Sequence, residues 1–420
     1  MRHYLKRKIS GETRKTCRTV CKVYSNSSDY IKKKPLLTQG FFILFKDFFL
    51  CHSQTETLKK IYFTVTNDLV YDQRMKRICG SLAKNDFEAV LVGRRLKHSL
   101  PLGKENYQQK RIGCWYNKGK LFYIEYNLRL FFFLLFKRMD GICAIDLDTI
   151  SPCLVISKLK KIPRIYDAHE FFTGLKEVVT RPPIKKLWTR IERIAVPQFR
   201  WGYTVSESIA DEFHRLYGVN YATIRNIPVL KPLDHLPVPE KFILYQGAVN
   251  EARGFEYLIP AMKMISYRLV ICGDGNFMDQ LKALITTNHV QDKVELKGML
   301  QPGELWKISQ QATIGVAFPE NIGLNQYLAL ANKFFDYIHA GLPQITVDFP
   351  EYKKLNDKYG VAVLVNDIEP KTIADSVNNL MADTVLLEQL RQNCKKAREE
   401  LNWENEEKKL INFYQNIFNS

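Results

Sequence analysis

Short apolar runs alternate with helical patterns along most of this chain, and the alternation starts twice. In the first half we expect strands at 61–65, 89–92, 142–145, 164–166, 203–205 and 222–224. After residue 240 the pattern restarts, with strands expected at 242–245, 268–272, 294–296, 314–317, 344–347 and 361–365. Strands that alternate with helices form parallel sheets that helices cover on both faces. The sequence therefore predicts two facing Rossmann-like α/β domains, which bind ligand in the cleft outside the carboxyl ends of their strands.

The domain boundaries follow from the chain length, the positions of the prolines and the helical patterns. Helices are expected at 74–84, 188–196 and 208–217, and a long helical region at 384–419 closes the chain. Prolines punctuate a polar segment between the two alternations, which makes it the expected linker. The 420 residues are enough for two domains of common size. We predict an extension over 1–58, a first domain over 59–228, a linker over 229–240, a second domain over 241–400 and a C-terminal helix over 401–420.

The first 58 residues differ from the rest. Residues 1–35 are rich in Lys, Arg, Ser and Thr without a hydrophobic period, so we expect them to be disordered. Five phenylalanines from Phe41 to Phe49 follow at helical spacing, which is typical of an interfacial amphipathic helix. The run is too short for a membrane span, and no small-residue cleavage site marks a secretory signal. Alternatively, translation starts at Leu58 and the upstream residues are an error in placing the start of the gene.

Composition favours a globular protein of a reducing compartment. The apolar fraction of 46% and the mean hydropathy of −0.24 are typical of soluble globular domains. The nine cysteines are scattered, without C-x-x-C pairs or histidines at metal spacing. This argues against a disulfide framework and a zinc site, and for the cytosol.

The net charge of +18 is concentrated in one half of the chain. Residues 1–235 carry roughly +22 and the remainder roughly −4. A basic half favours nucleic acid, anionic lipid or a pyrophosphate-bearing acceptor as partner, although part of the excess is ordinary solvated surface. No nucleic-acid-reading motif accompanies the charge, so lipid and pyrophosphate are the favoured partners.

An apolar burst, LRLFFFLLF, fills residues 128–136 and is followed by Lys137 and Arg138. Two interpretations stay open. The burst packs against the sheet, or it forms a face that contacts a membrane.

Lys333 and Asp336 are three residues apart, so both project from one face at the start of a helix that ends at Ala340-Gly341. Free N–H groups and an ammonium at a helix N-terminus suit a diphosphate, and a carboxylate beside them suits ribose hydroxyls. The pair therefore indicates a nucleotide-sugar site. The alternative is a surface lysine and a capping aspartate on an ordinary helix.

The stretch 328–351 resembles the donor-binding helix of the retaining GT-B glycosyltransferases of family 4. In that family the helix usually reads E-A-(M/I)-A-x-G-x-P-V-(I/V), and residues 336–345, DYIHAGLPQI, stand in its place. The resemblance runs from about Lys59 to the C-terminus. It includes, in order, TVTNDL (64–69), YDAHEFF (166–172), TVSESIA (204–210), IRNIP (224–228), YQGAVNEARG (245–254), ICGDG (271–275) and ELNWE (400–404).

The resemblance implies a GT-B fold in which the C-terminal helix crosses back onto the first domain. It implies a retaining, metal-independent enzyme that moves a sugar from a nucleoside-diphosphate sugar to a glycan or lipid-linked acceptor, without a cofactor. The usual setting is surface polysaccharide assembly in the cytoplasm, with or without peripheral attachment to the inner face of the plasma membrane.

On the donor side, the resemblance assigns Arg253 to the diphosphate, because the family carries a cation, usually Lys, in this loop. Arg253 and Lys333 together would neutralise the leaving group without a metal ion. A glycine-bearing turn after a strand allows close approach to the nucleotide and contains Gly273, Asp274 and Gly275.

One departure from the family leaves the donor sugar open. Most members carry a glutamate eight residues before the ribose carboxylate, where this chain has Leu328. Glu320, with Asn321 and Asn325, is the candidate to take over that contact through a longer loop.

In the first domain, His169 corresponds to a family histidine that faces the transferred sugar, although a histidine capping a strand end is the alternative. Glu170 is expected to orient it or to serve as a cleft carboxylate. The pair Asp146 and Asp148 has the spacing of a metal motif, but it follows a first-half strand, and we interpret it as acceptor-side or structural. The acceptor side is expected to begin at Asn67, Asp68 and Arg74, where Arg74 binds an acceptor phosphate or solvates its helix.

Two other functions compete with sugar transfer. A GT-B sugar-nucleotide epimerase would handle the same donor, but it needs a carboxylate for proton removal near the sugar, and its motifs differ. A nucleic-acid-binding protein would use the basic half, but this chain lacks a matching motif.

Overall fold

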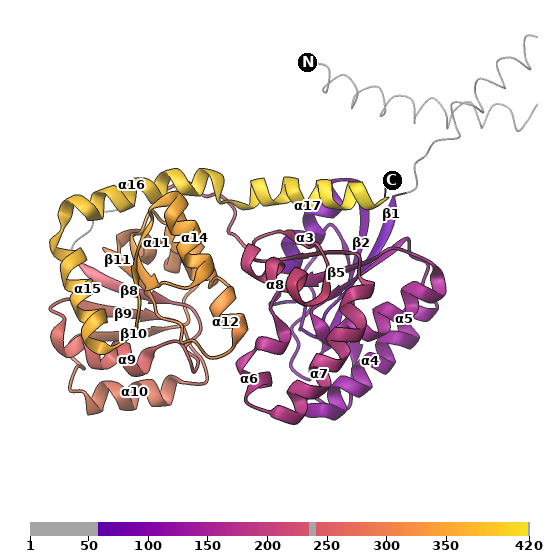
Figure 1. Ribbon diagram of the computed structural model, residues 1–420, viewed down its shortest axis with the longest axis horizontal. Coiled ribbons are helices and arrows are strands. Elements are labelled where there is room, and N and C mark those ends of the chain that lie inside the picture. Colours follow the sequence, from indigo (N-terminus) through magenta and orange to yellow (C-terminus); the bar gives the residue numbers. More distant parts are fainter. Residues whose placement is uncertain (1–57, 235–240, 419–420) are drawn as a thin grey trace, which may run out of the picture. The chain divides into compact units, whose positions relative to one another are not determined.

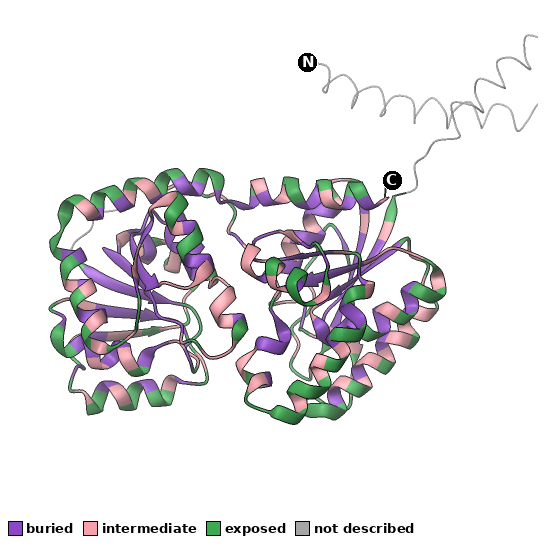
Figure 2. Cartoon of the chain, in the orientation of Figure 1, coloured by how far each residue is buried: buried purple, intermediate pink, exposed green. Residues whose placement is uncertain are grey.

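The computed structural model describes residues 58–234 and 241–418, which belong to one compact unit beginning at Leu58 (Figure 1). The predictions for residues 1–57, including the Phe41 to Phe49 spacing, lie outside the described residues. The described part folds into two parallel β-sheets, each flanked by helices. Buried residues are concentrated on the strands and on the inward sides of the helices, as Figure 2 shows.

The first sheet has the strand order β3-β2-β1-β4-β5-β6-β7 with every pair parallel. Its strands are β1 (Lys59–Thr64), β2 (Phe87–Arg95), β3 (Gln108–Gly113), β4 (Gly141–Ile145), β5 (Arg164–Ala168), β6 (Trp201–Thr204) and β7 (Ala222–Thr223). The central strands are continuous apolar runs because helices cover both of their faces. Every residue of β4, for example, is buried.

The second sheet has the order β10-β9-β8-β11-β12-β13 and is also parallel. Its strands are β8 (Phe242–Gln246), β9 (Arg268–Cys272), β10 (Val294–Gly298), β11 (Ile314–Ala317), β12 (Gln344–Val347) and β13 (Ala362–Val365). In both sheets the order reverses beside the first strand, and the loops at the carboxyl ends of such strands are where open α/β sheets bind ligands.

The first sheet is accompanied by α3 (Gln73–Lys84), α4 (Gly119–Leu135), α5 (Ile150–Lys160), α6 (Lys176–Val179), α7 (Pro182–Ala195) and α8 (Glu207–Tyr217). The second is accompanied by α9 (Phe255–Ala261), α10 (Met278–Thr287), α11 (Pro302–Gln311), α12 (Leu324–Leu328), α13 (Asn332–His339), α14 (Pro350–Tyr359), α15 (Pro370–Ala382) and α16 (Thr384–Glu400), and α17 (Trp403–Phe418) closes the described chain. Within residues 58–234 and 241–418, no helix has the length and apolar character needed to cross a membrane.

The C-terminal helical region is interrupted between α16 and α17 and serves both sheets. Cys394 and Ala397 of α16 lie in the core of the second sheet with Phe334. After the break, the Trp403 N–H donates to the Pro228 carbonyl at 3.0 Å, and α17 packs into the core of the first sheet beside β1. The last helix of the chain therefore stabilises the first domain, as in the crossing-back helix that the resemblance implies.

Several polar contacts join residues of the first domain to residues of the second domain. The buried Glu351 carboxylate, at the start of α14, accepts from the Ser208 backbone N–H at 3.1 Å and from its hydroxyl at 2.9 Å. It also forms an ion pair with Arg225 at 3.3 Å. A carboxylate at the N-terminus of α8 complements the partial positive charge of that helix end.

The apolar burst 128–136 forms the second half of α4 and ends at Phe136 just beyond it, and neither single interpretation describes the burst completely. One face of the helix, with Phe122, Tyr126, Leu130 and Leu134, is buried in the core of the first sheet. The opposite face is exposed and also apolar, with Leu128 and Phe132 in the burst itself. The burst thus packs against the first domain and also leaves an uncovered apolar strip.

Candidate functional site

Lys333 lies in the first turn of α13, directly beside the carboxyl end of β8. The residue is 9% exposed, and its ammonium lies 3.4 Å from the centre of the Tyr245 ring. Gly247 has a φ of +108° and no side chain, and a Cβ there would lie only 3.8 Å from Lys333 Nζ. Burial, followed by the nearby charge of Arg253, lowers the pKa of Lys333 well below its ordinary value.

Arg253 is the second cation at this position. It lies in a turn between Ala252, with a φ of +61°, and Gly254, with a φ of +78°. A Cβ at Gly254 would lie 2.2 Å from the Phe318 carbonyl oxygen, so the chain needs glycine there to pass β11. Among the described residues, neither Arg253 nor Lys333 forms an ion pair, and the charge of Arg253 lowers the pKa of Lys333 more than the charge of Asp336 raises it.

Asp336 lies one turn further along α13, on the same side as Lys333. Its Oδ2 accepts from Gln246 Nε2 at 3.0 Å, and Gln246 Oε1 accepts from the Ser309 hydroxyl at 2.8 Å. This second bond fixes which end of the Gln246 amide faces Asp336. Burial raises the pKa of Asp336 to about 6, although the Gln246 hydrogen bond and the charge of Arg77 act in the opposite direction.

The glycine turn after β9 packs directly on the loop after β8. A Cβ at Gly273 would lie 1.9 Å from the Gly247 carbonyl oxygen, and the φ of Gly273 is +153°. The Val249 N–H donates to the Asp274 carbonyl at 3.0 Å, and Asp274 Oδ1 accepts from the Gly275 N–H at 2.8 Å. The loop bearing Arg253 and the turn 273–275 therefore form one supported surface beside Lys333.

The loop after β11 contains the three residues proposed to replace the missing glutamate. The Glu320 N–H donates to the Ala252 carbonyl at 3.2 Å, and Glu320 Oε1 is buried without a hydrogen-bond partner among the described residues. Burial raises the pKa of Glu320. Asn321 is exposed, and the Asn325 Oδ1 accepts from the Phe171 N–H of the first domain at 2.7 Å. This hydrogen bond fixes which end of the Asn325 amide faces Phe171 and leaves its NH₂ group as a donor.

Leu328, at the position where the family usually has a glutamate, takes part in the packing of α12 on the first domain. Its side chain packs against the core of the first sheet, and its carbonyl accepts from the Ser206 hydroxyl at 2.9 Å.

His169 follows β5 and lies between two carboxylates. Its Nε2 is 3.1 Å from Asp167 Oδ2 and its Nδ1 is 3.8 Å from Asp146 Oδ2, while its backbone N–H donates to Asp146 Oδ1 at 2.9 Å. Burial by itself would lower the pKa of His169, but the two carboxylates outweigh it and raise the pKa. Asp146 has a φ of +55°, an unusual backbone conformation for a non-glycine residue, which often marks functional sites.

Arg74 holds the Asp167 carboxylate of this cluster in place. It forms an ion pair with Asp167 at 2.9 Å, and its other Nη donates to the Ile224 carbonyl at 3.2 Å. Arg74 is 5% exposed, so the expectation that it solvates its helix is wrong. Burial would raise the pKa of Asp167, but Arg74 and then His169 outweigh it and hold the pKa below its ordinary value.

The remaining first-domain candidates lie apart from this cluster or are already bound. Asp68 is buried, pairs with Arg111 at 2.7 Å and also accepts from the Ser99 hydroxyl. Asn67 is exposed and donates to Asp72 at 3.3 Å. Asp148 accepts from Thr66 at 2.5 Å. Glu170 is exposed beside His169, and Arg253 is near enough for its charge to act on Glu170.

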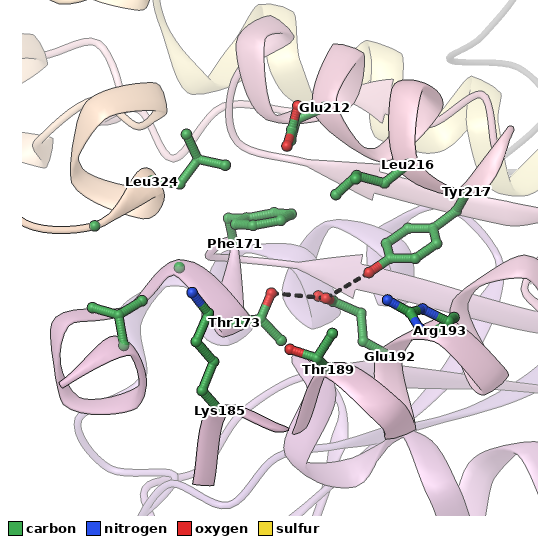
Figure 3. A pocket seen from close by; sticks show the side chains of 13 residues that line it. Phe171, Thr173, Lys185, Thr189, Glu192, Arg193, Glu212, Leu216, Tyr217 and Leu324 are labelled. Carbon is green, nitrogen blue, oxygen red and sulfur yellow. Dashed lines mark hydrogen bonds between the residues drawn. The ribbon is translucent and has the colours of Figure 1, made fainter. Parts of the chain in front are cut away.

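A pocket of about 560 Å³ opens next to the His169 loop and was not predicted (Figure 3). Its floor holds Glu192, whose Oε2 accepts from Thr173 and from Tyr217, both at 2.7 Å. Glu192 Oε1 is buried without a partner among the described residues, and could accept a hydrogen bond from a hydroxyl or amine. The only sequence signal is that Glu192 is the one acidic residue of an otherwise basic helix, α7.

Residues 233–400 match the family model described as "Glycosyl transferases group 1". The match contains Lys333, Arg253, Asp336 and the turn 273–275. This part of the chain is similar to the glycosyl transferases group 1 family. An uncharacterized glycosyltransferase of Methanocaldococcus jannaschii is 30% identical to the chain over 183 residues, which are 42% of this chain and 45% of that protein. The similarity thus spans less than half of that relative.

Solved structures support the fold of the whole described unit. Sucrose-phosphate synthase from Thermosynechococcus elongatus aligns with a TM-score of 0.73 and 15% identity, over 86% of this chain and 99% of that one. HepE from Anabaena, in complex with UDP-glucose, aligns with a TM-score of 0.66 and 11% identity, over 85% and 99% of the two chains. WaaG, a glycosyltransferase involved in lipopolysaccharide biosynthesis, aligns with a TM-score of 0.65 and 12% identity, over 86% and 100%. The chain has the GT-B fold, and the group 1 model matches its second domain.

Proposed function

We propose that this chain transfers a sugar from a nucleoside-diphosphate sugar to a glycan or lipid-linked acceptor. The observation that carries the proposal is the pair Lys333 and Arg253. Two cations without ion-pair partners among the described residues converge in the group 1 domain, and the pKa of the buried one is lowered partly by the other. A bound diphosphate would remove this repulsion and supply the missing negative charge.

The surroundings of the two cations match the other parts of a nucleotide. Asp336 is held by Gln246 and presents a carboxylate to ribose hydroxyls, and with a pKa of about 6 it is mostly ionised at neutral pH. The N-terminus of α13 adds backbone N–H groups that no side chain caps. The tight turn at 273–275 lets the backbone come close to the nucleotide.

Charge neutralisation by Lys333 and Arg253 is the basis on which we propose a metal-independent reaction. When the bond between sugar and diphosphate breaks, negative charge develops on the leaving phosphate, and preorganised cations stabilise it without rearranging. No resident cofactor is part of the proposed reaction, since the donor itself carries the leaving group.

We further propose that the transfer retains the configuration at the sugar carbon. Asp167 and Asp146 raise the pKa of His169 and so favour its imidazolium form, which would donate a hydrogen bond to a sugar hydroxyl rather than act as a base. The leaving phosphate would then accept the acceptor's proton on the face from which it departs. That route requires no separate general base.

The acceptor would lie toward the first domain, and we propose a cytoplasmic protein working on surface polysaccharide at the inner face of the plasma membrane. The strong basic excess of residues 1–235 supports a partner that bears phosphate groups, either as an anionic lipid or as a pyrophosphate-linked acceptor.

A donor-hydrolysis screen tests the proposed function without knowledge of the acceptor. The full chain is incubated with UDP-, GDP- and ADP-sugars, beginning with UDP-glucose, and the released sugar and nucleotide are quantified by NMR. Slow release of free sugar from one donor, abolished in Lys333→Ala and kept in Lys282→Ala on the exposed helix α10, is the expected result. Conversion of the donor to an epimer would instead assign an epimerase, and no donor turnover or nucleoside-diphosphate binding would overturn the proposal.

A further inference from the structure

Helix α4 exposes an apolar strip that nothing in the described part of the chain covers. Leu121, Ile124, Leu128 and Phe132 recur at spacings of three and four residues, and each is more than half exposed. Phe136 extends the strip just beyond the helix and is 81% exposed. Residues at this spacing share one face of a helix.

The face of α4 with Phe122, Tyr126, Leu130 and Leu134 is also apolar and is buried in the core of the first sheet. A surface helix normally turns charged and polar residues toward solvent on the side opposite to its buried face. Here that side carries an apolar strip instead, and a continuous exposed apolar strip of this length is typical of an interaction surface.

The neighbouring helices extend this surface. Helix α5 packs against both α4 and α7, and the three lie side by side under the first sheet in Figure 1. Val155 and Leu159 of α5, and Leu187 and Ile194 of α7, are also exposed. We call the exposed side of α4, α5 and α7 the docking face.

Cations predominate on the docking face. The exposed cations on or beside these helices include Lys118, Lys120, Lys158, Lys161, Lys185, Lys186, Arg190 and Arg193. The three helices contain only two carboxylates, and neither is free. Glu192 is buried, and Glu125 accepts from the Trp115 and Tyr116 backbone N–H groups and from Arg129.

Aromatic residues mark the start of the strip. Trp115 is 84% exposed and its ring stacks on the Arg129 guanidinium, with 4.7 Å from Cζ to the ring centre. Tyr116 beside it is exposed as well. Tryptophan and tyrosine favour the level of lipid headgroups, where one end of the ring is apolar and the other is hydrated.

We propose that the docking face lies on an anionic lipid bilayer, with α4 parallel to the membrane plane and its apolar strip below the headgroups. An apolar strip bordered mainly by cations fits a surface that is apolar inside and negatively charged outside. The inference deepens the membrane location proposed above by naming the surface, and it does not depend on sugar transfer.

Vesicle sedimentation of the full chain tests the apolar strip. The vesicles contain phosphatidylcholine with a third of phosphatidylglycerol, and pure phosphatidylcholine vesicles serve for comparison. The variant Leu128→Glu/Phe132→Glu should bind anionic vesicles at least about tenfold more weakly, since two large apolar side chains no longer leave water. The matched control Met299→Glu/Val385→Glu, which alters exposed apolar residues of the second domain, should bind like the natural chain.

Charge reversal tests the cations by comparing two double variants that have the same net charge. Each reversal in Lys158→Glu/Lys186→Glu should weaken binding by about fivefold or more, whereas Lys263→Glu/Lys282→Glu in the second domain should have little effect. Equal losses in both pairs would show that net charge alone is responsible and would overturn the proposed face. Binding by the natural chain should also fall as salt rises.

Two further results would assign another occupant to the strip. If the strip variant binds vesicles as well as the natural chain, another segment, such as residues 1–57, carries the contact and the proposal is wrong. If the natural chain does not bind lipid but forms a dimer that the strip variant loses, a second copy covers the face. Donor hydrolysis, measured in parallel, should be unchanged in the strip variant, which separates this test from the test of sugar transfer.

Discussion

The Asp167 carboxylate holds His169 and Arg74 at the same time, at 3.1 Å from Nε2 of the one and 2.9 Å from Nη2 of the other. Arg74 keeps Asp167 ionised in a fully buried position, and ionised Asp167 in turn favours the imidazolium form of His169. Arg74 thereby helps to position the histidine.

This relationship predicts the pH dependence of activity. Because the pKa of His169 is raised, its positive charge and any activity that needs it are present at low pH and are lost as pH rises through that raised pKa. In Asp167→Asn the pKa of His169 should fall, and the alkaline limb of donor hydrolysis should move to lower pH. Histidine proton resonances followed by NMR measure the pKa directly, with exposed His214 as the internal control. An unmoved alkaline limb would remove imidazolium from the mechanism.

Removing either cation of the pair should impair turnover more than folding. Lys333→Ala and Arg253→Ala should each weaken transition-state stabilisation by about 2–4 kcal/mol, the range found when single electrostatic donors are removed from active sites. Because both cations act on one diphosphate, their effects should not add in the double variant. Normal kcat/KM in both single variants with intact folding would exclude them from the mechanism.

Asp336 should show opposite effects on stability and on donor binding. Its pKa is raised, so the folded state binds the proton more tightly than the unfolded state, and stability falls as pH rises from the ordinary value of 3.8 toward about 6. Asp336→Asn removes this cost and should stabilise the free protein at pH 7 by about 1–2 kcal/mol, with no gain at pH 3. Thermal unfolding at the two pH values measures the difference.

The same variant tests the ribose contact. Asp336→Asn should raise the donor KM, and it should penalise a deoxyribose donor less than the natural one. Equal penalties would refute a ribose role. Turnover that is insensitive to magnesium and to a chelator is the outcome expected if Lys333 and Arg253 neutralise the leaving group.

The fold of this chain could be predicted largely from local patterns. Strands β9, β11 and β12 begin and end where expected, because each is a short apolar run between turn residues that becomes fully or almost fully buried. Strand β3 was not predicted, since QQKRIG at the sheet edge has no apolar period and remains partly exposed. The hydrogen bonds to β2 at the edge of the sheet, and not a hydrophobic pattern in its own residues, make this segment a strand.

The first-domain site could be predicted only in part. His169 was named from its place after a strand, but its partner Arg74 lies 93 residues from Asp167 and comes close only through the pairing of the sheet. No local sequence pattern indicates that two residues so far apart in the chain form an ion pair. Asp68 likewise looked like a ligand-facing residue after β1, yet Arg111 and Ser99 bind its carboxylate.

Gly273 should tolerate no side chain, although it carries no functional group itself. In Gly273→Ala the new Cβ would lie 1.9 Å from the Gly247 carbonyl oxygen, so the loop after β8 would have to move. We expect a loss of about 2 kcal/mol or more in stability and weakened nucleotide binding. Gly303→Ala is the matched control, since its Cβ would meet no atom within 4 Å and helix α11 should gain from alanine. Calorimetric titration with UDP and GDP compares the two variants, and equal nucleotide affinity in both would contradict the tight-turn role.

The final prediction concerns the glutamate that this chain lacks at position 328. If a glutamate at position 328 could contact the donor sugar, Leu328→Glu would raise donor hydrolysis. The structure predicts the reverse, because the Leu328 side chain packs against the core of the first sheet and an inserted carboxylate would lose that burial. We expect a destabilisation of about 1–3 kcal/mol with no gain in hydrolysis, whereas Leu328→Met should be nearly neutral.

Glu320 is the expected substitute because its Oε1 is buried and has no partner among the described residues, so a sugar hydroxyl could donate to it. Glu320→Gln should therefore reduce hydrolysis of the preferred donor while leaving the affinity for the free nucleoside diphosphate unchanged. Comparing the variant on two donors that differ only in one hydroxyl measures the discrimination it loses. If Glu320→Gln treats both donors as the natural chain does, and Leu328→Glu raises hydrolysis, the sugar contact belongs to position 328 after all.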